Sequence, residues 1–118
     1  MQCLFIINDP PYGTERVYNG LRLAHAILKR DAGDQVDVFL MADAVAGARQ
    51  GQKTPNGFYN VERMLKRVLA GDRSRVLLCG TCMDARGLTE DDLMAGATRS
   101  TMDELAELTA NADKVLIF

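Results

Sequence analysis

Short apolar runs alternate along this chain with segments whose apolar residues recur at helical spacing, and this alternation constrains the fold more than any other feature. The strand-like runs cover residues 2–7, 36–40, 75–78 and 115–118. Strands that alternate with helices form parallel sheets, because each crossover helix packs back onto the sheet. The pattern therefore predicts an α/β fold with a single, doubly wound, mainly parallel sheet, helices on both faces and the strand order 2-1-3-4.

Helix signals fill the segments between these runs. Apolar residues recur at helical spacing in residues 61–69, directly after Asn60, which is a good helix-capping residue. Thr14 is a candidate cap for an earlier helix that ends near Gly33, and Thr101 is a candidate cap for the last helix. These signals place a helix between successive strands, as a parallel sheet requires.

Length and charge indicate an ordinary globular chain. A length of 118 residues fits one domain that spans residues 1–118. The net charge of −2 gives no basic surface typical of nucleic-acid binding. No apolar run approaches the roughly 18 residues of a membrane span, and the first residues show no signal-peptide pattern. We therefore expect a cytoplasmic protein that binds neither nucleic acid nor membranes.

The cysteines are the residues most able to carry chemistry. Cys79 and Cys82 form a C-x-x-C motif directly after the third strand-like run. A structural zinc site needs four ligands, and the chain offers only Cys3 and His25 beyond this pair, so we expect no metal. Covalent haem attachment needs a histidine where Met83 stands, and we expect no cofactor.

A thiol that reacts at neutral pH has to ionise, so it needs partial exposure and a nearby cation or free N–H groups. Arg86 supplies a cation close in sequence, and Gly80 lets backbone amides approach. In the order 2-1-3-4, the loops at residues 8–13 and 79–87 meet at the switch point between strands 1 and 3, where open α/β sheets bind ligands. The candidate site residues are Cys79 and Cys82 as catalytic thiols and, around them as binding or stabilising residues, Arg86, Gly80, Thr81, Asn8, Pro11, Tyr12 and Gly13.

The residues by themselves leave the role of the cysteine pair open. A sulfur-carrying thiol, a dithiol redox pair and a non-catalytic module for a small molecule or anion each fit a C-x-x-C loop at a strand end. Free cysteines are also common as small hydrophobic residues in protein cores. We expect core packing for Cys3, which lies inside a strand, and a packing role on a helix for His25.

Ordered blocks along nearly the whole chain resemble a known family. The blocks are Pro11-Tyr12-Gly13, Asn19-x-Leu21-Arg22-Leu23-Ala24, Phe39-Leu40-Met41-x-Asp43-Ala44-Val45, Gly51-Gln52-Lys53, Gly57, Asn60, Met64-Leu65, Cys79-x-Thr81-Cys82-x-x-x-Arg86-Gly87 and Ala112-Asp113-Lys114-Val115-Leu116. Together they resemble the DsrE/DsrF/TusD superfamily, and most closely its YchN-like branch.

The resemblance implies a compact α/β fold and, in some branches, the relay of cysteine persulfide between sulfurtransferases. The sulfur-carrying cysteine of the TusD and DsrE branches lies eight residues before the glycine of an Arg-Gly pair, a position that Cys79 occupies before Gly87. A second cysteine at the position of Cys82 is a feature of the YchN-like branch. The resemblance thus implies a cytoplasmic sulfur-relay protein, a sulfurtransferase-type carrier that exchanges sulfur with donor and acceptor proteins.

Assembly into a homotrimer or homohexamer is also implied by the resemblance. Apolar residues around positions 42–46, together with Phe58 and Tyr59, exceed what one thin sheet layer can cover. We expect some of them at contacts between subunits.

Overall fold

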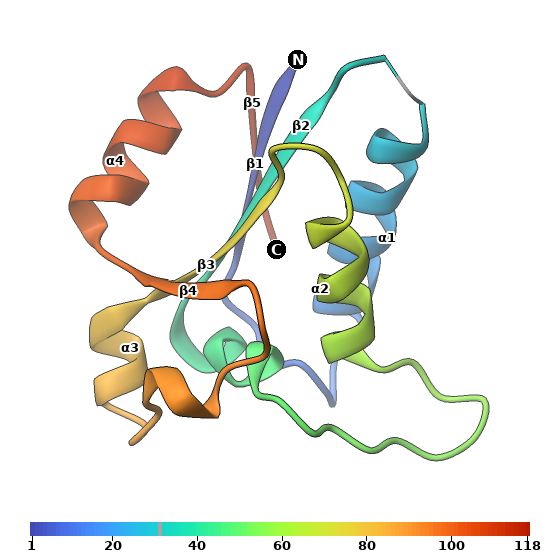
Figure 1. The fold of residues 1–118 in the computed structure, drawn as a ribbon, viewed down its shortest axis with the longest axis vertical. Coiled ribbons are helices and arrows are strands. Elements are labelled where there is room, and N and C mark those ends of the chain that lie inside the picture. The colour runs from blue at the N-terminus through green and yellow to red at the C-terminus, as the bar shows by residue number, and fades with distance from the viewer. Residues whose placement is uncertain (31) are drawn as a thin grey trace.

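The computed structural model describes residues 1–30 and 32–118 and contains one parallel sheet (Figure 1). Within the described residues the sheet has five strands in the order β4-β3-β2-β1-β5. The strands are β1 (Gln2–Ile7), β2 (Gln35–Leu40), β3 (Arg75–Cys79), β4 (Ala97–Ser100) and β5 (Lys114–Ile117). Every paired strand runs parallel to its neighbour.

Helices cover both faces of the sheet, as Figure 1 shows. The helices α1 (Arg16–Lys29) and α2 (Val61–Leu69) lie on one face, and α4 (Met102–Asn111) lies on the other. Short helical segments gather where the strands end: η1 (Ala42–Ala48), α3 (Gly80–Asp84) and η2 (Glu90–Asp92). The α/β class, the parallel sheet and the helices on both faces are confirmed.

The predicted strand order 2-1-3-4 is wrong, because β2 rather than β1 lies next to β3. Apolar runs show that strands are buried but do not show which strands are neighbours. The prediction also omitted β4, because residues 97–100 show no alternation of apolar and polar side chains. The last strand returns to the far side of β1, and its end is held by the bond from the Phe118 N–H to the Ile6 carbonyl.

Two hydrophobic clusters form the core, one on each face of the sheet. Phe5, Val38 and Leu78 face α1 and α2. Leu77 and Cys79 face α4, because successive side chains of a strand point to opposite faces. The thiol of Cys79 therefore lies on the α4 side, at the carboxyl end of the sheet.

Capping explains where two helices begin. The Asn60 side chain accepts a bond from the Arg63 N–H at the start of α2, as the sequence predicts. Thr101 does the same for the Glu104 N–H at the start of α4. Thr14 does not cap α1, since its hydroxyl donates to Asp9 instead.

The described residues include no helix that is long and apolar enough to cross a membrane.

Candidate functional site

Cys79 ends β3 and stands at the N-cap position of α3. Its sulfur accepts a bond from the Cys82 N–H, with 3.4 Å between the two atoms. The Thr81 hydroxyl oxygen lies 3.2 Å from the same sulfur. Only 5% of Cys79 is exposed, so these neighbours decide which protonation state the thiol prefers.

The pKa values of the two thiols are moved in opposite directions. Burial raises the pKa of Cys79, but hydrogen bonds from Cys82 and Thr81 outweigh it and bring the pKa below its ordinary value. Burial raises the pKa of Cys82, and the hydrogen bond with the Cys79 thiol raises it further. Cys79 is therefore the thiol that ionises first, and a thiolate is the nucleophilic form of cysteine.

Arg99 on β4 supplies a cation next to Cys79. Its guanidinium makes two bonds to the Asp84 carboxylate, at 2.7 Å and 2.9 Å. It also lies so close to Gly80 that a β-carbon there would be 2.8 Å from the guanidinium carbon. Gly80 thus makes room for this arginine. The pKa of Arg99 is raised by Asp84 first, and the negative charge of the Cys79 thiolate adds to that effect.

A small hollow of about 160 Å³ opens beside Cys79. The end of β4, with Ser100, and the start of α4, with Thr101 and Met102, form its other wall. Ser100 is paired with Cys79 in the register of β3 and β4, and its hydroxyl donates to Glu104. Met102 is 59% exposed, so the hollow has an apolar rim at the protein surface.

Arg86 lies beside Cys82. Its Nε donates to Asp43 at 2.9 Å and its Nη1 donates to the carbonyl oxygen of Cys82 at 3.0 Å. The charge of Arg86 lowers the pKa of Cys82, although burial and the Cys79 thiol outweigh this effect. Arg86 therefore lies beside the cysteine segment, where it binds Asp43 of η1 and the backbone carbonyl oxygen of Cys82.

The loop at residues 8–13 occupies another part of the same end of the sheet. Asn8 donates its N–H to Phe118, and the Tyr12 hydroxyl binds Gln52 and the Val61 N–H. Pro11 lies beside Gly47 of η1, and Gly13 has a φ of 101°. Since β2 lies between β1 and β3, the crevice predicted between this loop and the cysteines is not the arrangement observed.

Sequence reasoning missed Arg99 and Ser100 because it missed β4. These residues lie between Gly96, whose φ is 90°, and the cap of α4. In an α/β fold, a strand often occupies a short segment between a turn and the start of a helix. Gly96 and the cap residue Thr101 mark such a segment, and this pattern could have indicated β4.

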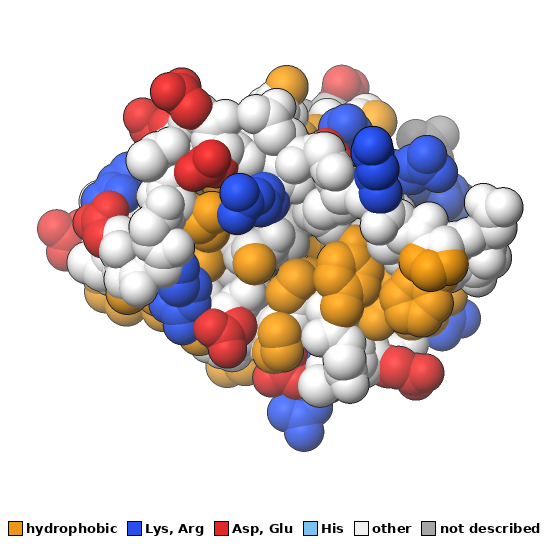
Figure 2. Space-filling view, turned by 90° about the horizontal axis from the view of Figure 1, so that it is seen from below, with side chains coloured by type: hydrophobic (Ala, Val, Ile, Leu, Met, Phe, Trp, Pro, Cys, Tyr) orange, Lys and Arg blue, Asp and Glu red, His pale blue; other side chains and the backbone are white. Residues whose placement is uncertain are grey.

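The end of the molecule that carries this site is shown from below in Figure 2. Hydrophobic side chains gather at this surface, with Lys and Arg side chains among them. In the part of the chain that the structure describes, no three His, Cys, Asp or Glu side chains are grouped as a metal site would need. Cys3 is buried in the core, where burial raises its pKa.

Comparisons with known proteins agree with this architecture. The model of the DsrE/DsrF-like family matches residues 1–118. Protein YchN of Escherichia coli strain K12 is 42% identical over 119 residues, which covers 100% of both chains. The crystal structure of the ychN protein from E. coli matches with a TM-score of 0.90, again over 100% of both chains.

A more distant relative carries a functional name. Sulfurtransferase TusD of Salmonella arizonae is 24% identical over 129 residues, with all of both chains covered. From the match over its whole length and from these relatives, the chain belongs to the DsrE/DsrF-like family.

Proposed function

We propose that this protein is a sulfur-relay carrier that holds a persulfide on Cys79. The observation that carries the proposal is the environment of the Cys79 sulfur, which receives hydrogen bonds from Cys82 and Thr81 and has its pKa lowered by them. Hydrogen bonds that stabilise a thiolate also stabilise a persulfide anion, which carries its charge on sulfur. The family and the name of its relative TusD support sulfur as the cargo.

In the loading step, the Cys79 thiolate attacks the outer sulfur of a donor persulfide. The bond between the two donor sulfurs breaks, the donor leaves as a thiolate, and Cys79 holds the outer sulfur with its proton. In the unloading step, an acceptor thiolate attacks that same sulfur and Cys79 leaves as a thiolate. Neither step needs an external oxidant or reductant, because the outer sulfur moves without a net change in electrons.

Arg99 and Thr81 have distinct roles in this scheme. Thr81 stabilises the charge on the sulfur of Cys79, which lies 3.2 Å from its hydroxyl oxygen. Arg99, held by Asp84 on the wall of the hollow, provides positive charge where the outer sulfur of the persulfide would lie. Arg86 acts on the Cys82 side through its bond to the Cys82 carbonyl.

The partners that fit this chemistry are a donor protein and an acceptor protein that present cysteine sulfur at the hollow. The exposed Met102 offers an apolar contact at its rim. We place the exchange in the cytoplasm, where thiols are kept reduced, and expect a homotrimer or homohexamer to carry it out.

Mass spectrometry after incubation with a low-molecular-weight persulfide tests the proposal. We expect one added sulfur atom on the peptide that contains Cys79 in the wild type and in Cys82→Ser, and none there in Cys79→Ser. Cys3→Ser is the control, because Cys3 is buried outside the site and its replacement should leave the adduct unchanged. An unmodified wild type, or an adduct that persists in Cys79→Ser at Cys82 or Cys3, contradicts the assignment.

A dithiol redox function is a second candidate, favoured by the bond from the Cys82 N–H to the Cys79 sulfur and by the opposite pKa shifts of the two thiols. Cys82 would attack the inner sulfur of the Cys79 persulfide, which forms a disulfide and releases hydrosulfide. This function predicts a Cys79–Cys82 disulfide that forms and is reduced reversibly at cytosolic potentials. Titration against a glutathione redox buffer measures it, and a pair that stays reduced throughout excludes it.

A further inference from the structure

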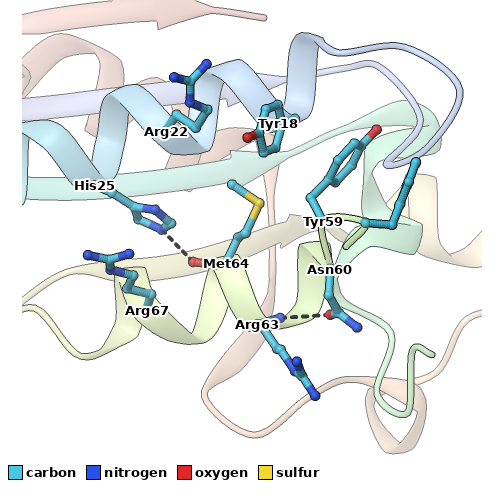
Figure 3. Close-up of a pocket in the computed structure, with 9 residues that line it drawn as sticks. Tyr18, Arg22, His25, Tyr59, Asn60, Arg63, Met64 and Arg67 are labelled. Atoms are coloured by element: carbon cyan, nitrogen blue, oxygen red, sulfur yellow. Dashed lines mark hydrogen bonds between the residues drawn. The ribbon is translucent and has the colours of Figure 1, made fainter. Parts of the chain in front are cut away.

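A groove between α1 and α2 combines aromatic rings with positive charge, away from Cys79. It has a volume of about 390 Å³, within the size range of small-molecule sites. We call it the α1/α2 groove and define it by three aromatic and three cationic side chains: Tyr18, Phe58, Tyr59, Arg22, Arg63 and Arg67. Figure 3 shows Arg22 on the α1 rim, Arg63 and Arg67 on the α2 rim, and Tyr59 and Met64 between them.

The aromatic rings form a continuous stack. The ring centre of Tyr59 lies 4.5 Å from that of Tyr18 and 4.5 Å from that of Phe58. Phe58 is 51% exposed, so its ring leaves apolar aromatic surface in contact with solvent at one end of the groove. A flat aromatic ligand can stack there without displacing any core residue.

The cations of this region are not balanced by carboxylates. Two further hollows adjoin the groove and share Arg67 and Arg63 with it, and they add Lys29 and Lys53 to the lining. Of the residues that the structure describes, no Asp or Glu lines any of these three hollows. Although the net charge of the chain is −2, five of its 14 Lys and Arg residues line the groove and the two hollows that adjoin it.

Contacts within the groove keep part of it in place. Arg22 lies 5.3 Å from the ring centre of Tyr18 and donates to Asn19 at 3.1 Å. His25 on α1 donates its Nε2–H to the Met64 carbonyl oxygen on α2 at 2.8 Å, which joins the two helices across the floor. Asn60 is buried and fixes the first turn of α2, from which Arg63 extends.

We propose that the α1/α2 groove binds a nucleoside di- or triphosphate, with its base stacked on the Phe58 and Tyr59 rings and its phosphates held by Arg22, Arg63 and Arg67. A base fits because aromatic side chains stack on any base without reading its sequence. A polyphosphate fits because guanidinium groups bind phosphate oxygens in pairs of hydrogen bonds. A site with both features binds the combined ligand more tightly than either part alone.

Isothermal titration calorimetry of the full-length protein with ATP tests the proposal at low ionic strength. We expect one site per chain, and binding at least about tenfold weaker with adenosine or with inorganic triphosphate. Arg63→Gln combined with Arg67→Gln should weaken ATP binding at least about tenfold, and Phe58→Ala should weaken it severalfold. Both arginines and Phe58 are exposed, so these variants should fold.

Matched control variants distinguish a specific ATP site from nonspecific electrostatic attraction between ATP and the protein. Arg49→Gln combined with Lys114→Gln changes the net charge equally but lies outside the groove lining, and ATP affinity should stay within about twofold. Cys79→Ser should bind ATP as the wild type does, so this inference and the sulfur-relay proposal fail independently. No ATP binding, equal affinity for inorganic triphosphate, or equal loss in the control pair overturns the proposal. If the wild type does not bind ATP and the Arg63→Gln/Arg67→Gln variant sediments differently from the wild type, the proposal is wrong and the groove is a contact with a second copy of the chain.

Discussion

At the scale of single residues, the pKa of the Cys79 thiol depends on a few hydrogen bonds that offset its burial. Burial alone raises the pKa of the Cys79 thiol, and the bonds from Cys82 and Thr81 reverse the sign. A hydrogen bond to a charged acceptor contributes about 1.5–3 kcal/mol, which is enough to decide the balance. The reactivity of the thiol should therefore respond to the loss of one donor.

Replacement of Thr81 by valine tests this dependence. Valine keeps the shape of threonine but cannot donate to the sulfur 3.2 Å away, so the pKa of Cys79 should rise and less thiolate should be present near neutral pH. We expect the alkylation rate of Cys79 by iodoacetamide to fall by roughly threefold or more. The midpoint of the rate against pH should move to higher pH.

Thr98→Val is the matched control, since Thr98 is exposed on β4 and makes no hydrogen bond to Cys79. Its alkylation rate should equal that of the wild type when Cys79 is followed by peptide mass. An unchanged rate in Thr81→Val means that the hydroxyl does not stabilise the thiolate.

The sequence pattern identified Cys79 and Cys82 as the candidate thiols, but it did not identify Arg99 as the cation beside Cys79. Sequence proximity favoured Arg86, and the structure places Arg86 next to Cys82. Arg99 lies next to Cys79 because the pairing of β4 with β3 sets Ser100 opposite Cys79, and the guanidinium of the adjacent Arg99 reaches Gly80 and Asp84 of α3. Strand pairing sets this contact, and no pattern within residues 76–87 contains it.

At the scale of elements, the contact between α1 and α2 contains the single histidine of the chain. Burial lowers the pKa of His25, the bond to the Met64 carbonyl raises it, and the charge of Arg67 lowers it again, so the net shift is downward. The folded protein therefore resists protonation of His25 more than the unfolded chain does. The stability due to this shift is present above the unfolded pKa and is lost as the pH falls through the folded pKa.

Replacement of His25 by glutamine should remove this pH dependence. Between about pH 7.5 and about pH 5.5, the free energy of unfolding of the wild type should fall more than that of His25→Gln. Glutamine keeps an N–H that can reach the Met64 carbonyl, so the variant should fold. Urea titrations at both pH values measure the difference, and parallel losses in the two proteins would show that His25 does not titrate in this window.

The elements themselves were predicted well where their signals were strong. β1 and α2 have the predicted bounds, because an apolar run and a capped periodic segment each define an element locally. α3 and β4 were missed, since each is short and is stabilised by contacts with the rest of the fold. Arg99 on β4 binds Asp84 on α3, and this contact supports both elements.

At the scale of the whole molecule, the two faces of the sheet are covered unequally. α1 and α2 cover one face, and α4 covers the other among the described residues. On the α4 side, Val115 is 40% exposed and Ile117 is 69% exposed. Of the residues that the sequence suggested for subunit contacts, Ala44 and Val45 are buried within the chain, whereas Phe58 is exposed. Assembly stays a prediction, and the α4 side of β5 is now the surface that best fits it.

Replacement of Ile117 by glutamate should weaken self-association. A carboxylate at a buried subunit contact loses its hydration without gaining a partner, so we expect association at least about tenfold weaker in sedimentation velocity experiments. Leu23→Glu is the control, because Leu23 is 39% exposed on α1 and should not affect assembly. A wild type that sediments as a monomer, or an equal effect of both variants, contradicts this interface.

The sequence by itself determined the class of fold and the position of the thiols. Alternating strand and helix periods permit little other than a helix-covered parallel sheet, and the apolar run of β3 must end where Cys79 begins a loop or helix. These properties depend on residues that are neighbours in the chain.

Only the tertiary structure decided which strands are neighbours, and with them the surroundings of each thiol. The insertion of β2 between β1 and β3 separated the proline-bearing loop from the cysteines, and the pairing of β4 with β3 brought Arg99 and the start of α4 to Cys79. The physical reason is that strand order is selected by packing and hydrogen bonding over the whole sheet, which local side-chain periodicity does not encode.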